Sequence, residues 1–196
     1  MKFLAISFFV LGASAFTLYQ PDGREKETYE IMELVLRKEG ATKIYQQACN
    51  ERFLASTDSL KKLYELTGDS SFRLGERKRV QLVEQAKASA STKWDKHKVY
   101  HYTIVEKDKV ADVSASVMDF KISPEYRSEN GKTLSIHRIS VPLFKSESEA
   151  IVYVEFGMIG ILNNEINFNE GHQKVYLVRK HNTKWSVVKG VLIGGN

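Results

Sequence analysis

Cysteine and proline are scarce in this 196-residue chain, and several common motifs are missing. Cys49 is the only cysteine, so the chain cannot form an internal disulfide and must be stabilised by its core. The sequence contains no Cys-x-x-Cys, His-Glu-x-x-His or Gly-x-Ser-x-Gly motif and no glycine-rich phosphate loop. These absences remove the usual signatures of zinc sites, serine nucleophiles and nucleotide cofactors. We therefore expect neither a metal nor a cofactor.

A large excess of one charge is also missing. The chain has 29 Lys and Arg against 24 Asp and Glu, a formal net charge of +5, and both signs are scattered along it. The densest basic run, Glu76-Arg77-Lys78-Arg79, is either an anion-binding surface or a solvated helix face. This mild surplus predicts no nucleic acid as a partner.

The longest hydrophobic stretch stands at the start of the chain. Lys2 precedes the apolar stretch 3–11 and the small residues Ala13-Ser14-Ala15, which are the three parts of a cleavable secretory signal. The stretch is shorter than the ~20 apolar residues that span a bilayer. We therefore expect residues 1–15 to be a signal peptide cleaved after Ala15, with no transmembrane segment left after its removal. The mature chain is then periplasmic or secreted.

Helical periodicity dominates the first half of the chain. Residues 16–27 are polar and contain a Pro-Asp-Gly turn signal, so we expect a flexible lead-in there. Apolar residues then recur three and four positions apart, the spacing of one helix face. The expected helices cover 28–40, 42–55, 58–68 and 76–91, with a cap at Thr28 and ends near Gly40 and at Gly68.

After Trp94 the hydrophobic period changes to two, which is typical of β-strands. The expected strands cover 99–106, 110–122, 133–144, 150–156, 174–180 and 184–193. Asn130-Gly131 favours a tight hairpin turn, and residues 181–183 are a short link between the last two strands. Short links require antiparallel neighbours. Pro142 marks a strand end or a sheet edge, because proline lacks the N–H that a central strand needs.

This order of elements predicts one α+β domain over residues 28–196, with the N-terminal helices packed on one face of a curved antiparallel β meander. In the last strand Trp185, Val187, Val191 and Ile193 have the same parity. We therefore expect these four side chains to face the core together, with Trp185 as the anchor of the final hairpin.

Several stretches resemble a group of secreted bacterial proteins that has no assigned activity. They are 79–87, the Pro-x-Phe segment 142–144, the Ala-x-Val-Tyr strand 150–153 and the terminal hairpin 175–185, which ends in Lys-Trp. More distantly, helices followed by a curved sheet resemble nuclear-transport-factor-2-like (NTF2-like) cones. The resemblance implies an NTF2-like or cystatin-like architecture and an extracytoplasmic location, and it implies no catalytic residue.

Glu155 is the leading candidate for a functional side chain, because it interrupts the apolar run 151–156. Alternation places it on the same face as Tyr153. A buried carboxylate needs a partner or a raised pKa, which makes Glu155 a candidate polar group in a pocket. The alternative is that the strand ends here and Glu155 faces water. Tyr153 and His137 complete the candidate set.

Two other features have simpler interpretations. His97 and His101 would share a face of a helix, but they lie at the start of the expected strand 99–106, where four residues span ~13 Å, so they cannot share a zinc ion. Cys49 lies among apolar residues at helical spacing. We expect it to pack in the core as a small hydrophobe rather than act as a nucleophile.

Three functions are compatible with these features. The first is a non-enzymatic extracytoplasmic module that binds a protein, a glycan or a small ligand. The second is a small cone-shaped hydrolase or isomerase with a pocket around Glu155, Tyr153 and His137. The third is an inhibitor or an envelope structural protein with a wide exposed apolar patch. A closed pocket with convergent polar groups would favour the second.

Overall fold

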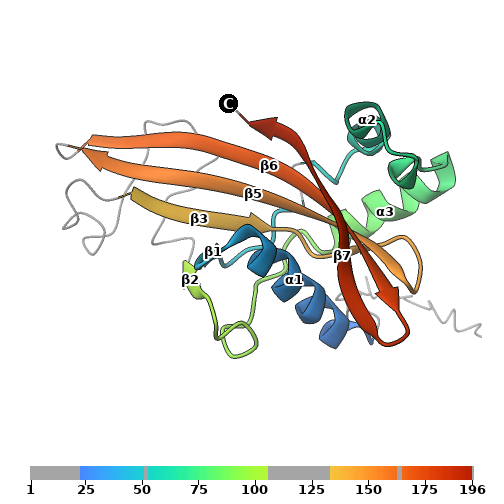
Figure 1. Cartoon of the computed structure of the whole chain (residues 1–196), viewed down its shortest axis with the longest axis horizontal. Coiled ribbons are helices and arrows are strands. Elements are labelled where there is room, and N and C mark those ends of the chain that lie inside the picture. Colours follow the sequence, from blue (N-terminus) through green and yellow to red (C-terminus); the bar gives the residue numbers. More distant parts are fainter. Residues whose placement is uncertain (1–22, 51–52, 106–132, 163–164, 196) are drawn as a thin grey trace, which may run out of the picture.

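The computed structural model describes residues 23–50, 53–105, 133–162 and 165–195, and over these residues the fold is α+β (Figure 1). The helices are α1 (Glu25–Glu39), α2 (Thr57–Thr67) and α3 (Glu76–Ala88), with a short 3-10 turn η1 (Ser70–Phe72). The strands are β1 (Lys43–Tyr45), β2 (Thr103–Val105), β3 (Thr133–Ile139), β4 (Leu143–Phe144), β5 (Glu149–Leu162), β6 (Glu165–His181) and β7 (Lys184–Gly195).

The strands form one curved, open sheet that is mixed rather than antiparallel throughout. Its order over the described residues is β2-β1-β3-β5-β6-β7, with β4 paired to β5. The expected meander is correct for β3, β5, β6 and β7, which are antiparallel neighbours. It is wrong at β1, which pairs in parallel with both β2 and β3. Parallel pairing is possible here because long connections separate β1, β2 and β3 along the chain.

Left-handed glycines end the first two helices, as the sequence predicts. Gly40 (φ 67°) and Gly68 (φ 61°) follow the last residues of α1 and α2, and glycine adopts this conformation without the cost that a Cβ brings. The N-terminal end of α1 differs from the expected cap at Thr28. Helix α1 begins at Glu25 rather than at Thr28, and Ser56 precedes α2, where its hydroxyl accepts a hydrogen bond from the Ser59 N–H.

No helix forms over 42–55 in the part of this segment that the structure describes. Residues 43–45 are β1, and the chain that follows is bonded to distant backbone: the Ala48 N–H donates to Thr92 O (2.9 Å) and the Cys49 N–H to Ile139 O (3.2 Å). Most of the apolar residues are buried all the same, and Phe53 is partly buried. Bonds to distant parts of the chain therefore override the local helical spacing of this segment.

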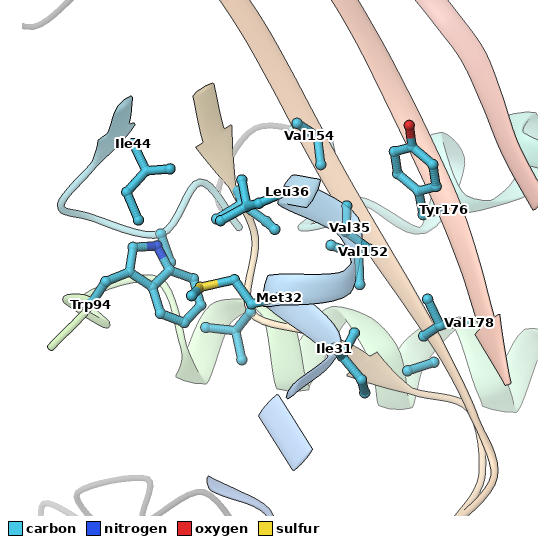
Figure 2. Close-up of a cluster of buried hydrophobic side chains, with 14 of the residues drawn as sticks. Ile31, Met32, Val35, Leu36, Ile44, Trp94, Val152, Val154, Tyr176 and Val178 are labelled. Atoms are coloured by element: carbon cyan, nitrogen blue, oxygen red, sulfur yellow. The ribbon is translucent and has the colours of Figure 1, made fainter. Parts of the chain in front are cut away.

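Helix α1 covers one face of the sheet. Figure 2 shows its apolar residues against the even-numbered positions of β5 and β6. The buried members from these three elements are Ile31, Met32, Val35, Leu36, Ala150, Val152, Val154, Tyr176 and Val178. Full burial of each aliphatic side chain contributes about 1.5–3 kcal/mol, so this cluster is a main source of stability.

Helices α2 and α3 and the η1 turn cover the opposite face, so the expectation that all helices share one face is wrong. Their buried residues pack against the odd-numbered positions Ile151, Tyr153, Val175 and Leu177. Both parities of β5 and β6 are therefore buried. Strands covered on both faces have continuous rather than alternating apolar runs, and Ala150–Val154 is such a run.

Strands β3, β5 and β6 extend beyond the helices as an arm (Figure 1). Strand β5 continues to Leu162 and β6 begins at Glu165, so both are longer than the expected strands 150–156 and 174–180. The expected strand 133–144 is divided into β3 and β4 on either side of Pro142, in agreement with the predicted strand end. The expected strand 110–122 and the Asn130-Gly131 turn lie outside the described residues.

The final hairpin forms where the sequence places it, but its side chains do not all face one way. Trp185 is 4% exposed and packs with Val187 in the α1 cluster, whereas Val191 and Ile193 pack against the opposite cluster. A register shift in the pairing of β6 with β7 explains the difference, because Val178 pairs with Val187 while Leu177 pairs with Lys189. One extra residue in β7 reverses the parity of the positions that follow it, up to a second register shift after Leu192.

None of the helices in the described part of the chain has both the length and the apolar character needed to cross a membrane.

Candidate functional site

Glu155 is buried, with 7% of its surface exposed, and it lies within β5 rather than at a strand end. Its Oε1 accepts a hydrogen bond from Tyr153 Oη (2.7 Å), so the two side chains share a face as expected. Its Oε2 lies 3.5 Å from Arg138 Nη1. Arg138 is the cross-strand partner of Glu155 in β3, and its guanidinium lies over the Tyr45 ring (5.1 Å). We call Glu155, Tyr153 and Arg138 the Glu155 cluster.

His137 does not join this cluster. It is 3% exposed and pairs with Phe156, so it occupies the opposite face of the sheet from Arg138 and Glu155. Its ring packs on Phe156 (4.8 Å between centroids), and Phe156 stacks in turn on His172 of β6 (5.1 Å). The candidate set Glu155, Tyr153 and His137 is thus divided: two members touch, and the third lies across the sheet.

A second polar cluster lies on this opposite face, at the end of α1. Glu39 is the last residue of α1, and only 1% of its side chain is exposed. Its carboxylate accepts hydrogen bonds from His172 Nε2 (2.7 Å), from Lys174 Nζ (3.0 Å) and from the Tyr176 hydroxyl. We call these four residues the Glu39 cluster. The cluster joins α1 to β6, so Glu39 lies more than a hundred residues before its three donors in the sequence.

The electrostatics of the Glu39 cluster follow from these contacts. Burial alone would raise the pKa of Glu39, but the hydrogen bonds from Tyr176, His172 and Lys174 outweigh it and hold the pKa below its usual value. Burial and the bond to Glu39 raise the pKa of the Tyr176 hydroxyl. Glu39 is therefore ionised at neutral pH and Tyr176 is protonated, so neither is poised to exchange a proton.

His137 lies beside the Glu39 cluster with one ring nitrogen unsatisfied. Its Nδ1 is buried and has no hydrogen-bond partner in the structure. Burial lowers the pKa of His137, Glu39 opposes this effect, and His172 and Lys174 add to it. The neutral imidazole is therefore the favoured form. It packs against Phe156 and lies on the other side of the sheet from Glu155.

The other residues considered in the sequence are Cys49, the basic run of α3, and His97 and His101. Cys49 is buried in the α2 and α3 cluster, as predicted. In the basic run at the start of α3, Lys78 Nζ donates to Lys145 O (2.8 Å) and the Arg79 guanidinium donates to Leu74 O. His97 and His101 lie in the exposed loop before β2 rather than on a strand. Within the described residues no group of three or more His, Cys, Asp or Glu could hold a metal ion.

Sequence reasoning missed Glu39, Arg138 and His172. Glu39 resembles any acidic residue at a helix end, and its donors follow more than a hundred residues later, so no local pattern could identify it. Arg138 had a partial signal. It directly follows His137, so alternation along one strand predicts that only one of the two can lie on the face of the sheet that carries Glu155.

Comparison of the chain with family models, with curated protein sequences and with solved structures gives no significant match.

Proposed function

We propose that the protein is a non-enzymatic, extracytoplasmic binding module. The single observation that carries the choice over an enzyme is the division of the candidate catalytic set: Glu155 and Tyr153 on one face, His137 on the other. A general acid or base must reach its partner within about 2.6–3.2 Å or through one water molecule. A β-sheet between two side chains does not permit this.

The partners of the buried carboxylates support the same proposal. Glu155 accepts from Tyr153 and faces Arg138, and Glu39 accepts from three donors. Charged groups that are buried with hydrogen-bond partners are costly to leave unpaired, which suits a structural tie. A catalytic carboxylate needs at least one oxygen that substrate can approach. The extracytoplasmic location follows from the secretory start of the sequence and is part of the proposal.

The finer identity of the fold is also part of the proposal. The curved antiparallel succession β3, β5, β6 and β7, with α1 packed against it, supports an NTF2-like or cystatin-like relationship. The parallel pairs made by β1 depart from a simple meander. An inhibitor or envelope structural protein, which would present a wide exposed apolar patch, has weaker support. The two core clusters bury apolar side chains on both faces of β5 and β6, under the helices.

Two measurements on the full chain, expressed in a bacterial host, test the proposal. Mass mapping of the exported protein should find Phe16 at the mature N-terminus; a cytoplasmic product that retains Met1 would contradict export. The purified protein should then be assayed on chromogenic esters, phosphates and glycosides beside Glu155→Gln. We expect no turnover that depends on Glu155. Turnover that the folded variant loses would establish the hydrolase interpretation instead.

Native mass spectrometry of the exported protein distinguishes the ligand classes within the proposal. A small ligand or glycan that remains bound increases the native mass over the denatured mass. A protein partner gives a larger complex that dissociates into two chains on denaturation.

A further inference from the structure

We propose that the loop at residues 95–102 is the surface by which this module binds its partner, and that the partner presents an acidic protein segment. This inference rests on the proposed binding function and adds a location and a partner chemistry to it. In Figure 1 the loop projects below β2, away from α2 and α3. No part of the loop belongs to the Glu39 or Glu155 cluster.

The loop is anchored to the core and to α1 by its first residues and by Val99. Trp94 and Val99 are buried in the α1 cluster, and Trp94 packs edge-on against Tyr29 (5.9 Å, 75°). The Tyr29 hydroxyl accepts a hydrogen bond from the Asp95 N–H (3.1 Å), and Asp95 Oδ1 accepts one from the His97 N–H (2.9 Å). The carboxylate of Asp95, the single acidic residue of the loop, therefore bonds to the backbone of the loop itself.

Further hydrogen bonds join backbone groups within the loop. The N–H groups of Lys98 and Val99 donate to Asp95 O, and the Tyr102 N–H donates to Val99 O (2.9 Å). The Tyr102 hydroxyl lies 3.4 Å from Glu33 O on α1. A segment tied at both ends loses little conformational entropy when it binds, so its contacts contribute to affinity with little offset.

The outer side of this loop carries an aromatic ring in water. Tyr100 is 74% exposed, the largest exposed fraction among the large apolar and aromatic side chains whose exposure the structure describes. It packs on the neighbouring imidazole of His101, with ring centroids 4.0 Å apart. Tyrosine is enriched among the residues that dominate protein interfaces, because it offers a large contact area with few rotatable bonds.

The exposed titratable side chains nearest to Tyr100 along the chain are all of basic type. They are Lys96, His97 and His101 within the loop and Lys93 just before it. Lys98 is also exposed, but its ammonium pairs with Glu25 and lies over the Tyr29 ring (5.3 Å), so it serves to hold the loop on α1. An aromatic centre with a polar rim is the usual anatomy of a protein interface. A rim of lysines is complementary to carboxylates, so the loop fits an acidic segment.

A short fluorescein-labelled polyglutamate peptide is the probe, measured by fluorescence anisotropy at an ionic strength of about 0.1 M. The wild-type full chain should bind it, and Lys93→Glu/Lys96→Glu should weaken binding at least about tenfold, as expected for loss of charges that steer and hold a partner. The control Lys61→Glu/Lys62→Glu makes the same change of charge on exposed positions of α2. It should stay within about twofold of wild type, because charges beyond a Debye length of ~10 Å are screened.

Tyr100→Ala separates an interface from simple charge attraction. Its ring is in water, so the variant should keep the wild-type unfolding curve and lose about fivefold to tenfold in affinity, as for a moderate aromatic hot spot. Equal loss in the two lysine pairs, no effect of the loop variants, or no binding by the wild type would each overturn the proposal. Tighter loop-dependent binding to anionic phosphatidylglycerol vesicles than to the peptide would also overturn it, and would assign the loop to membranes.

The two proposals can fail separately. Glu155-dependent turnover would contradict the non-enzymatic function whatever the loop variants do. Loss of the loop proposal, with export confirmed and no such turnover, would leave a binding module whose contact surface lies elsewhere.

Discussion

The two faces of the sheet are closed in different ways. On one face a single helix, α1, covers β5 and β6, and its last residue, Glu39, binds three donors on β6. On the other face α2, η1 and α3 share the cover, and the buried charged pair of Glu155 and Arg138 lies between neighbouring strands. The difference lies in what each buried carboxylate joins: on the α1 face it ties a helix to the sheet, whereas on the other face it ties one strand to the next.

The largest effect is expected from Trp185 on the α1 face. Trp185→Ala should cost ~3–5 kcal/mol in the free energy of unfolding, as for other buried indoles, out of the ~5–15 kcal/mol typical of a domain. The variant should be unfolded or poorly exported. The control, Lys184→Ala, alters an exposed neighbour and should leave the urea midpoint unchanged. A wild-type midpoint for Trp185→Ala would contradict the role of this indole in the core.

Glu39→Gln tests the polar tie directly. Loss of the charge weakens bonds to three donors, and we expect a cost of ~2–3 kcal/mol from the range for charged hydrogen bonds. Glu33→Gln is the matched control, because Glu33 pairs with Arg37 on the exposed side of the same helix. An exposed pair of this spacing contributes about 0.3–0.5 kcal/mol. Equal costs for the two variants in chemical denaturation would show that the Glu39 cluster does not hold α1.

Gly190 tests the packing beneath Tyr176. A Cβ at Gly190 would lie 2.3 Å from Tyr176 Cε1, so Gly190→Ala must displace the ring that bonds Glu39. The expected cost is ~1–3 kcal/mol, as for other overpacked sites. At Gly194 the nearest atom is the flexible end of Gln173, and Gly194→Ala should cost less than half as much. Thermal unfolding of both variants decides the point; the reverse order would contradict it.

Cys49 tests the core of the opposite face. Cys49→Ala should cost ~1–2 kcal/mol, as for a small truncation in a packed core, and should leave peptide binding unchanged. The native thiol should react slowly with Ellman's reagent, because it is buried. Rapid labelling under native conditions would show that the sulfur is reachable by solvent and would reopen a chemical role for it.

The smallest effect is a dependence of stability on pH. The depressed pKa of His137 means that stability declines as pH falls below 6.5 toward the folded-state pKa, because the unfolded chain binds the proton more readily. The slope is at most about 1.4 kcal/mol per pH unit. Glu39 adds a second decline below pH 4.5, since its folded-state pKa is also depressed. His137→Asn should flatten the first decline in urea titrations and leave the second; an unchanged first decline would assign it to other groups.

Part of this structure could be predicted from the sequence, because it depends on local chemistry. Gly40 and Gly68 ended their helices as expected, and the short link at 181–183 joined antiparallel strands. Glu155 and Tyr153 met because alternation along one strand is a local rule. In each case the cause lies within a few residues of the feature.

The rest could not be predicted, because it depends on contacts between distant segments. The register shift in β7 at Val188 has no local turn signal, and it moved Val191 and Ile193 to the other face. The segment 42–55 has helical spacing, yet its described backbone bonds to Thr92 and Ile139. The donors to Glu39 lie on β6, so only the assembled sheet could reveal that cluster.

The most direct test of the central claim is a double-mutant cycle of unfolding free energies with Glu39→Gln and Glu155→Gln. If the two clusters are separate ties on opposite faces, the costs should add within about 0.3–0.5 kcal/mol, as for independent sites. An interaction energy above about 1 kcal/mol would show that the two carboxylates belong to one coupled polar site, and would contradict the separation of the two faces that also keeps His137 away from Glu155.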